Sequence, residues 1–286
     1  MRFFRFTLFA PAIGFLAVMT LAPFLFVLAA SFCQVRLGTP VTFVGLHHYA
    51  ALARDPYVWL AARNTLGLTL AAVGIELVAG AGLALLFRRT LPGSGLMRFV
   101  ILVPMMLSPL LVGLFWKYML DQVFGVATWG ASLVLDSRPS VLTSPGLAFG
   151  SILLVDVWQW TPFVFLLCTA GLHGLPPELE EAAALERASR WRQLRAIVLP
   201  HLKPALVLAG LFRGIDTMKI FDLVYILTGG GPGDATVTLS LLTYRQGFQF
   251  FDTGRASALS ILLLVIVNLL ATAALKRSRP AGTAAA

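Results

Sequence analysis

The sequence has few charged residues. Only 12% of its 286 residues are Asp, Glu, Lys or Arg, whereas 58% are hydrophobic. Soluble domains carry about a quarter charged residues, so this chain cannot cover itself with a water-facing surface. No charge occurs between Arg5 and Arg36, a run longer than the ~20 apolar residues that cross a bilayer. The composition excludes an ordinary soluble domain and predicts an all-α membrane protein.

Cysteine and the common catalytic motifs are also scarce. Cys33 and Cys168 lie in different apolar segments and have neither disulfide nor metal-site spacing. The sequence contains no HExxH helix and no GxSxG elbow, which argues against a membrane enzyme. It contains no Gly-Lys dipeptide, and therefore no Walker A loop to cradle phosphates. We expect no catalytic residue, no metal site and no cofactor on this chain.

Six apolar segments are long enough to span a membrane. A cleaved signal peptide is the alternative for the first segment, but its apolar stretch exceeds the roughly 7–15 residues of a signal core. A lipoprotein site at Cys33 is disfavoured by the large Phe32 before it. We therefore predict one transmembrane unit over residues 1–286. Its expected spans are 7–31, 64–87, 99–118, 147–172, 202–226 and 256–275, with a loop at 176–200 between the fourth and fifth.

The basic residues fall mostly on one side of these spans. Thirteen lie in the termini and in the second and fourth connections, and six lie on the other side. The positive-inside rule then places both termini and the 176–200 loop in the cytoplasm. Clustering at alternate span ends also argues against nucleic acid as a partner. The thirteen are Arg2, Arg5, Arg88, Arg89, Arg98, Arg187, Arg190, Arg192, Arg195, Lys203, Lys276, Arg277 and Arg279; the six are Arg36, Arg54, Arg63, Arg138, Arg245 and Arg255.

The loop 176–200 is charged and helix-forming. Pro176-Pro177 end the preceding helix and suit the first turn of a new one, whose start is acidic. A second short helix is expected over Trp191–Ile197, ending at Leu199-Pro200. A DNA-binding helix-turn-helix is disfavoured by the tether between two spans, and a plain connecting loop by the alanine patch. Two such short helices are marginal alone in water, so we expect them to dock on a partner.

The loop resembles the EAA loop of permease subunits in binding-protein-dependent ABC importers. That pattern has Glu-Ala-Ala, then Asp-Gly-Ala, then Ile-x-Leu-Pro. This sequence departs from it at two positions, with Glu186 in place of the aspartate and Arg187 in place of the glycine. A glycine there would permit a turn with φ > 0 that arginine disfavours. The resemblance implies that the ATPase subunit is bound by Glu181, Ala182, Ala183, Glu186, Ala188, Ile197, Leu199 and Pro200.

Two further stretches are similar to the sugar-type permeases, whose relatives include maltose and glycerol-3-phosphate importers. They are Phe43–Leu46 and the glycine-rich Leu227–Thr236. The resemblance implies a second, different permease subunit, two copies of an ATPase that carries ATP and magnesium, and an external substrate-binding protein. It also implies a multi-pass protein in the cytoplasmic membrane of a bacterium or archaeon.

Polar residues inside the fourth and fifth segments share helical faces. Asp156, Gln159, Trp160 and Phe163 have i, i+3, i+4, i+7 spacing. Charges at membrane depth usually face a bundle interior or a water-filled cavity. Hydrogen-bonding side chains mixed with aromatic faces suit a sugar, so these faces are predicted to line a substrate pathway. Its residues are Asp156, Trp158, Gln159, Trp160, Phe163, Arg213, Asp216 and Thr217.

Other interpretations of the polar residues stay open. Arg213 and Asp216 also have the i, i+3 spacing of a structural ion pair. Glu76 is expected to hydrogen-bond a neighbouring helix, with proton transfer as the alternative. The leading function is a sugar or polyol permease. The alternatives are a glycerol-phosphate permease, favoured by Arg213 and Lys219, and a proton-coupled transporter using Glu76 and Asp156.

Overall fold

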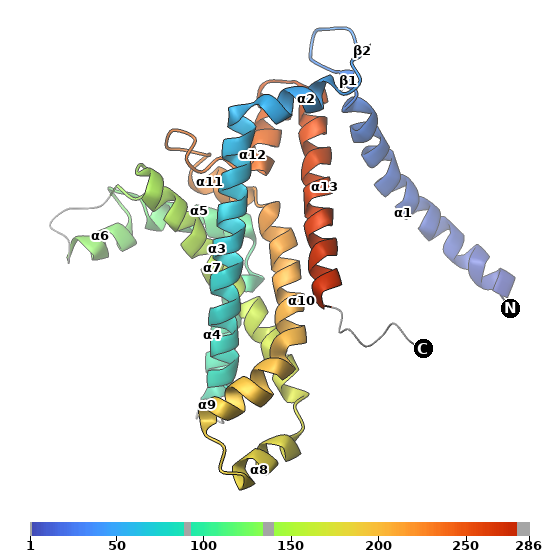
Figure 1. Cartoon of the computed structure of the whole chain (residues 1–286). Coiled ribbons are helices and arrows are strands. Elements are labelled where there is room, and N and C mark those ends of the chain that lie inside the picture. Colours follow the sequence, from blue (N-terminus) through green and yellow to red (C-terminus); the bar gives the residue numbers. More distant parts are fainter. Residues whose placement is uncertain (1, 89–92, 134–139, 279–286) are drawn as a thin grey trace. The chain divides into compact units, whose positions relative to one another are not determined.

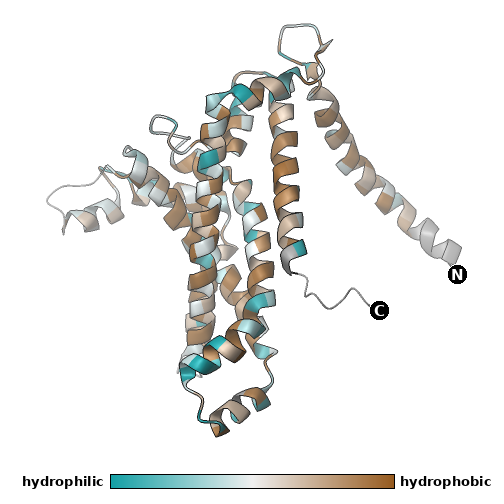
Figure 2. Ribbon diagram, viewed as in Figure 1, coloured by the Kyte–Doolittle hydropathy of each residue, from teal (hydrophilic) through white to brown (hydrophobic). Residues whose placement is uncertain are grey.

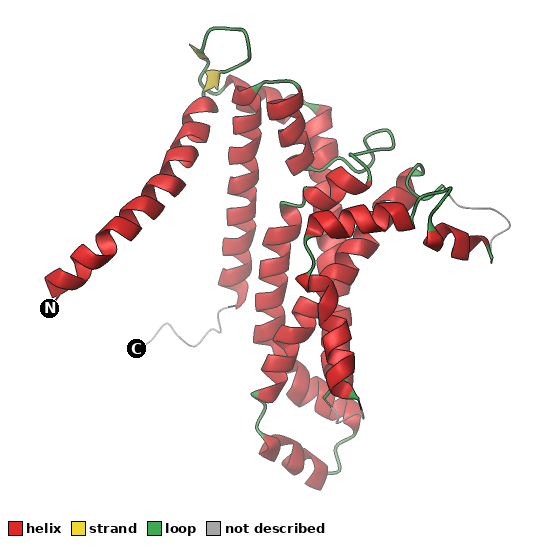
Figure 3. Ribbon diagram, turned by 180° about the vertical axis from the view of Figure 1, so that it is seen from behind, coloured by secondary structure: helices red, strands yellow, loops and turns green. Residues whose placement is uncertain are grey.

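The computed structural model describes residues 2–88, 93–133 and 140–278, so Arg89, Arg138 and Arg279 of the basic count lie outside the described residues. Regular structure in the described part is helical apart from one small hairpin (Figure 3). The elements before the loop are α1 (Arg2–Ala30), β1 (Cys33–Gln34), β2 (Thr42–Phe43), α2 (His47–Arg54), α3 (Pro56–Leu86), α4 (Ser94–Met106), α5 (Pro109–Met119), α6 (Val126–Ser132) and α7 (Pro145–His173). Those that follow are α8 (Pro177–Leu185), α9 (Arg190–Gln193), the π-helical turn η1 (Leu194–Val198), α10 (Leu199–Met218), α11 (Asp222–Leu227), α12 (Leu239–Tyr244), a second π-helical turn η2 (Arg245–Gln249) and α13 (Thr253–Ser278).

The described residues contain five helices that are long and apolar enough to cross a membrane. They are α1, α3, α7, the continuous helix Arg190–Met218, and α13. The pair α4 and α5 makes a sixth if the two helices together form one span, although they meet at a bend of 99°. Figure 2 shows hydrophobic residues along the shafts of these helices and hydrophilic residues at α8 and α9. The chain is an all-α membrane protein.

The chain divides into two compact units. The first comprises Met1–Ala61 and Leu239–Ile266. Here β1 and β2 pair antiparallel, and His48 of α2 bonds the Cys33 carbonyl at 3.1 Å. The Arg255 guanidinium pairs with the Asp55 carboxylate. These contacts tie α2, the hairpin and the start of α13 together.

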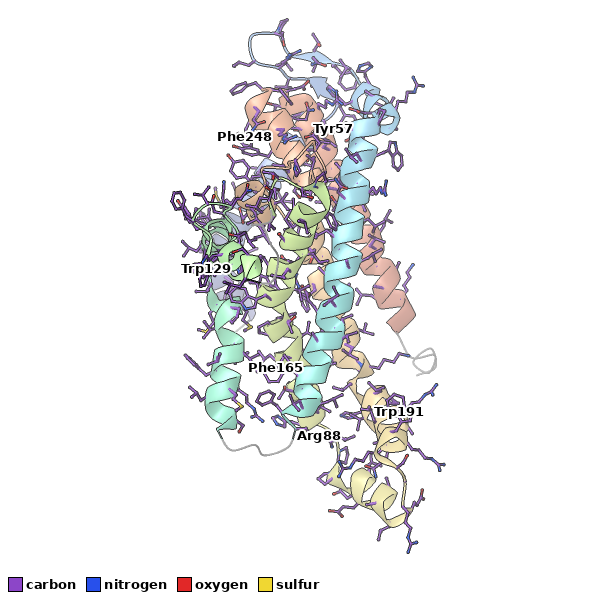
Figure 4. The ribbon with its side chains drawn as sticks, turned by 90° about the vertical axis from the view of Figure 1, so that its left-hand side faces the viewer. Tyr57, Arg88, Trp129, Phe165, Trp191 and Phe248 are labelled. Atoms are coloured by element: carbon purple, nitrogen blue, oxygen red, sulfur yellow. The ribbon has the colours of Figure 1, made fainter. Side chains whose placement is uncertain are left out.

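The second unit comprises Ala62–Thr238 and Val267–Ala286 and holds most of the helical bundle. In it α3, α7 and α10 run side by side (Figure 1). A Cβ added at Gly80 of α3 would lie 2.6 Å from the Cβ of Val164 on α7, so glycine permits this close crossing. The Phe87 ring packs edge to face against the Phe165 ring of α7, with ring centroids 5.8 Å apart; Phe165 is labelled in Figure 4. The apolar core continues through Ala84, Cys168, Leu172, Val198, Leu202 and Ala209.

An acidic side chain organises the turn after α5. The backbone N–H groups of Val123 and Phe124 donate to the Asp121 carboxylate at 2.8 and 2.9 Å. The bond from Phe124, followed by that from Val123, holds the pKa of Asp121 below its usual value. This turn leads into α6, whose Trp129 is exposed.

The third and fifth expected spans differ from the structure. The third is not one straight helix, because Pro109 has no N–H to continue the ladder and Leu107 adopts an extended conformation with ψ of 145°. The fifth ends at Met218 rather than at 226. Lys219 closes the helix, and the chain restarts as α11 at Asp222. Both breaks interrupt membrane helices, and the backbone N–H and C=O groups beside each break lose their usual partners within the helix.

The expected stop at Leu199-Pro200 is wrong. The helix that begins at Arg190 continues through Pro200 to Met218. Its hydrogen bonds are rearranged just before the proline, where the N–H of Leu199 reaches the Leu194 carbonyl in a π-helical turn. Because Pro200 cannot donate and its ring crowds the preceding turn, this wider turn keeps the helix continuous.

Candidate functional site

A buried ion cluster joins three helices of the second unit. The Arg213 guanidinium on α10 donates from Nε and Nη2 to Glu76 of α3, at 2.7 and 2.9 Å. Nη2 also reaches Asp156 of α7 at 2.8 Å, and Nη1 reaches Asp216 at 2.9 Å. Arg213, Glu76 and Asp156 are 2%, 0% and 3% exposed. The cluster holds α3, α7 and α10 together at membrane depth.

The cluster contains the ion pair that was the structural alternative for Arg213 and Asp216, and the helix-to-helix hydrogen bond that was expected of Glu76. Arg213 pairs with Asp216 at i, i+3, and Glu76 bonds a neighbouring helix. What the sequence did not indicate is that one guanidinium serves all three carboxylates. The planar fork of arginine suits this arrangement, since its donors are fixed in several directions. Trp160 covers the same group, with its ring centroid 4.8 Å from Arg213 Cζ.

Beside the cluster lies a pocket of about 260 Å³ with a mixed polar and aromatic wall. Five predicted pathway residues line it: Asp156, Gln159, Trp160, Asp216 and Thr217. Six further residues were not predicted, namely Pro109, Lys219, Ile220, Phe221, Asp222 and Leu223. They reach the pocket because the helix breaks at Leu107–Ser108 and at Lys219–Phe221 bring backbone to it. In the sequence, the charges of Lys219 and Asp222 within an otherwise apolar stretch could have indicated that this segment lines the pocket.

Three predicted pathway residues lie elsewhere. Trp158 points to another face of α7 and packs against Trp116, with ring centroids 5.6 Å apart. Phe163 sits between Trp160 and Phe212, at 6.5 and 6.4 Å. Arg213 is buried in the ion cluster behind the pocket wall. Trp158 differs because it lies one residue before Gln159, which turns it by about 100° around an α-helix.

Two polar side chains of the wall differ in their hydrogen bonding. The Gln159 amide donates through Nε2 to the Leu107 carbonyl at 3.1 Å. This carbonyl lies at the break between α4 and α5, where an unpaired group in the membrane would be costly. Thr217 is 1% exposed, yet its Oγ1 makes no hydrogen bond to any described residue. Gln159 thus pairs the carbonyl at the helix break, while the Thr217 hydroxyl is buried without a hydrogen bond to a described residue.

The loop between α7 and α10 has a well-defined turn. α8 ends at Leu185, and Arg187 adopts φ of 53°. The N–H of Ala188 bonds the Ala183 carbonyl at 2.9 Å, and that of Arg187 bonds Ala184 at 3.0 Å. These are the two bonds of a Schellman motif, which normally places glycine in the left-handed position. Arg187 therefore makes the bend that the family pattern makes with glycine.

The exposed face of this loop differs in part from the predicted contact set. Glu181, Ala182, Glu186 and Pro200 are exposed, but Ala183 is only 8% exposed and cannot offer its side chain to a partner without rearrangement. Ile197 packs against the apolar core. Of the remaining predicted residues, Ala188 is partly exposed and Leu199 is exposed.

An exposed leucine at the end of α8 was not predicted. Leu185 is 86% exposed, and Leu179 one to two turns earlier is 48% exposed. Leu179 lies within the charged start of the helix and Leu185 ends it, whereas sequence reasoning stressed the charges and the alanines. Glu181 and Leu185, four residues apart, share one face of α8, and Leu179 lies on another face.

The described residues hold no cluster of three or more His, Cys, Asp or Glu side chains arranged to bind a metal ion. The chemistry available in the pocket is hydrogen bonding by carboxylates, the Gln159 amide and the Lys219 ammonium, together with aromatic contact. Such a wall can bind and release a hydroxyl-rich molecule.

Comparisons with known proteins agree with one another. The family described as "Binding-protein-dependent transport system inner membrane component" matches residues 76–281. The trehalose transport system permease protein SugA of Mycobacterium tuberculosis is 38% identical, over 94% of this chain and 87% of its own length. The trehalose/maltose permease MalF of Thermococcus litoralis is 36% identical, over 79% and 76%. The sulfoquinovosyl glycerol permease SmoG of Agrobacterium fabrum is 33% identical, over 91% and 85%.

Two solved structures share the fold. One is a bacterial ABC transporter involved in the import of the acidic polysaccharide alginate, with a TM-score of 0.86 at 20% identity, covering 98% of this chain and 96% of that chain. The other is a bacterial alginate transporter in complex with its pentasaccharide-bound periplasmic protein, with a TM-score of 0.85 and coverage of 97% and 94%. At this identity the likeness concerns the fold alone.

Proposed function

Because the chain belongs to the family of binding-protein-dependent transport system inner membrane components, we propose that it carries a sugar, an oligosaccharide or a polyol across the membrane. The substrate is delivered by an external binding protein and moved at the expense of ATP. The chain acts as a transport subunit and not as an enzyme. Relatives named for trehalose, maltose and sulfoquinovosyl glycerol support the sugar class.

The observation that carries the proposal is the pocket on α7 and α10. Its wall joins the carboxylates of Asp156 and Asp216 with the aromatic side chains of Trp160 and Phe221. Carboxylates accept hydrogen bonds from sugar hydroxyl groups, and aromatic faces match the C–H side of a pyranose ring. The proton-coupled alternative is less well supported, because Glu76 and Asp156 are both bonded to Arg213.

The proposed assembly places the chain beside a second, different permease subunit. Two copies of an ATPase bind ATP and magnesium and contact the loop that contains α8. The whole complex lies in the cytoplasmic membrane of a bacterium or archaeon. In support, α8 exposes Glu181 and Leu185 on one face, and the matched family is named for inner membrane components.

Uptake by the reconstituted complex tests the substrate class. Proteoliposomes containing this chain, its partner permease, the ATPase and the binding protein are given a panel of labelled sugars, polyols, amino acids and peptides. Sugar or polyol uptake that requires ATP is expected. Trp160→Ala should lower it several-fold, because an aromatic contact contributes about 1 kcal/mol. Trp158→Ala is the matched control, since Trp158 packs on Trp116 away from the pocket. Uptake of amino acids or peptides alone would contradict the proposal.

The role of α8 is tested with Glu181. This carboxylate is exposed near the start of the helix, where it can pair with a basic group of the ATPase. Glu181→Lys should uncouple ATP hydrolysis from uptake, and Glu181→Gln should do so less. Both are measured as ATP consumed per sugar imported in complexes of equal yield. An unchanged ratio for Glu181→Lys would remove α8 from the ATPase contact.

A further inference from the structure

The pocket wall contains more acidic than basic side chains. Asp156, Asp216 and Asp222 line it, and Lys219 is the one cation among the lining residues. Glu76 adds a fourth carboxylate just behind, through its bonds to Arg213. Even if one of these carboxylates carries a proton, acidic groups still outnumber basic ones at the wall.

Arg213 cannot attract an anionic ligand to the pocket. Its Nε, Nη1 and Nη2 all donate to protein carboxylates at 2.7–2.9 Å. Its side chain is 2% exposed, and the Trp160 ring lies over it. Binding an anion would require breaking a buried ion pair, which is strongly unfavourable. Arg213, which favoured a glycerol-phosphate substrate in the sequence analysis, is therefore already paired with carboxylates of the protein.

We propose that this pocket selects uncharged sugars and polyols and excludes sugar acids and sugar phosphates. The proposal rests on the proposed function of the pocket as part of the substrate route. A sugar hydroxyl group donates to the Asp216 or Asp222 carboxylate. A carboxylate or phosphate in the same place meets like charges a few ångströms away. In a partly buried site such repulsion disfavours the anion by about tenfold or more.

Direct ligand binding tests the proposal without the selectivity of the external binding protein. The complex of both permeases and the ATPase is placed in lipid nanodiscs, and saturation-transfer NMR is recorded with trehalose and with its derivative in which one CH₂OH group is oxidised to a carboxylate. Wild-type complex should bind trehalose at least about tenfold better than the acid. Asp222→Asn should lower the ratio of the affinity for trehalose to the affinity for the acid, and Asp222→Lys should lower this ratio further. Asp121→Lys, which makes the same charge change outside the pocket, should leave it unchanged.

Charge selection is overturned if the wild-type complex binds the two sugars equally well. It is also overturned if Asp222→Lys and Asp121→Lys change the ratio of the two affinities equally. Neither result contradicts the proposed function in sugar transport. Binding of neither trehalose nor its acid by a complex that imports trehalose shows that this pocket is not the binding site, and the proposal fails. If the uptake panel selects another sugar, the neutral and carboxylate forms of that sugar are compared instead. If the uptake panel also shows no sugar import, the proposed function itself is wrong. Complex yield is measured for every variant, so misfolding is recognised separately.

Discussion

Arg213 shows how a single side chain can determine whether this membrane helix is tolerated. α10 carries an arginine at membrane depth, which would be costly on a lipid-facing helix. Burial against Glu76 and Asp156 supplies the charge partners, and Asp216 completes the set at the rim, where its side chain is 54% exposed. The stability of the bundle thus depends on residues that are far apart in the sequence.

Removing Arg213 should be much worse than removing Asp216. Arg213→Met leaves two buried carboxylates without their cation, which costs roughly 3–5 kcal/mol, so the yield of folded complex should collapse. Asp216→Asn removes a partly exposed partner and should cost about 1 kcal/mol or less. Yield is measured by size-exclusion chromatography with a fluorescent fusion.

A compensating variant separates charge balance from packing. Adding Glu76→Gln and Asp156→Asn to Arg213→Met removes the orphaned charges and should restore much of the yield. A triple variant as poor as Arg213→Met alone would show that packing, and not charge pairing, is what Arg213 provides.

At the scale of the element, α8 and its turn show which features could be predicted. The start of the helix at Pro176-Pro177, its acidic first turn and its approximate length followed from local sequence. The left-handed conformation of Arg187 did not, because arginine disfavours that region. Neighbouring hydrogen bonds from Ala188 to Ala183 and from Arg187 to Ala184 impose it.

The helix breaks and the ion cluster show the limit of local reasoning. Spacings of three and four residues correctly grouped Asp156 with Trp160 and Arg213 with Asp216. They could not join Glu76 to Arg213, which is 137 positions away. They also missed that Pro200 lies inside a continuous helix, since the compensating π-helical turn depends on backbone geometry.

Arg187→Gly should stabilise the turn after α8. Glycine adopts φ > 0 without the steric cost that a side chain incurs, so a gain of up to about 1 kcal/mol is expected. Arg187→Val should destabilise the turn instead, because a β-branched residue at positive φ is strongly disfavoured. Hydrogen exchange of the 182–190 amides in the assembled complex measures both effects. Faster exchange in Arg187→Gly than in wild type would contradict the left-handed geometry.

For the molecule as a whole, the uneven distribution of Lys and Arg predicts the orientation. Five basic residues lie at Arg187–Lys203, whereas the segment after α11 has none before Arg245. The positive-inside rule then places α8 in the cytoplasm and the glycine-rich segment outside. The five candidate spans and the bent pair are compatible with this orientation.

Cysteine labelling in intact cells checks this orientation. In a background with Cys33→Ser and Cys168→Ala, an impermeant maleimide should modify Asp234→Cys and leave Ser189→Cys unmodified. Permeabilised cells provide the control, since Ser189 is exposed in the folded chain and should then react. Labelling of Ser189→Cys in intact cells would show that the predicted orientation is wrong.

The uninterrupted helix from Arg190 to Met218 has a mechanical consequence. Its 29 residues correspond to a rod about 43 Å long, at about 1.5 Å per residue. One end adjoins the turn after α8, and the last turn at the other end carries Asp216 and Thr217 of the pocket wall. A tilt of about 10° around the midpoint of such a rod displaces each end by about 4 Å in opposite directions. A displacement of this size exceeds the length of a hydrogen bond, so a small rotation at one end of the lever is enough to reshape the pocket at the other.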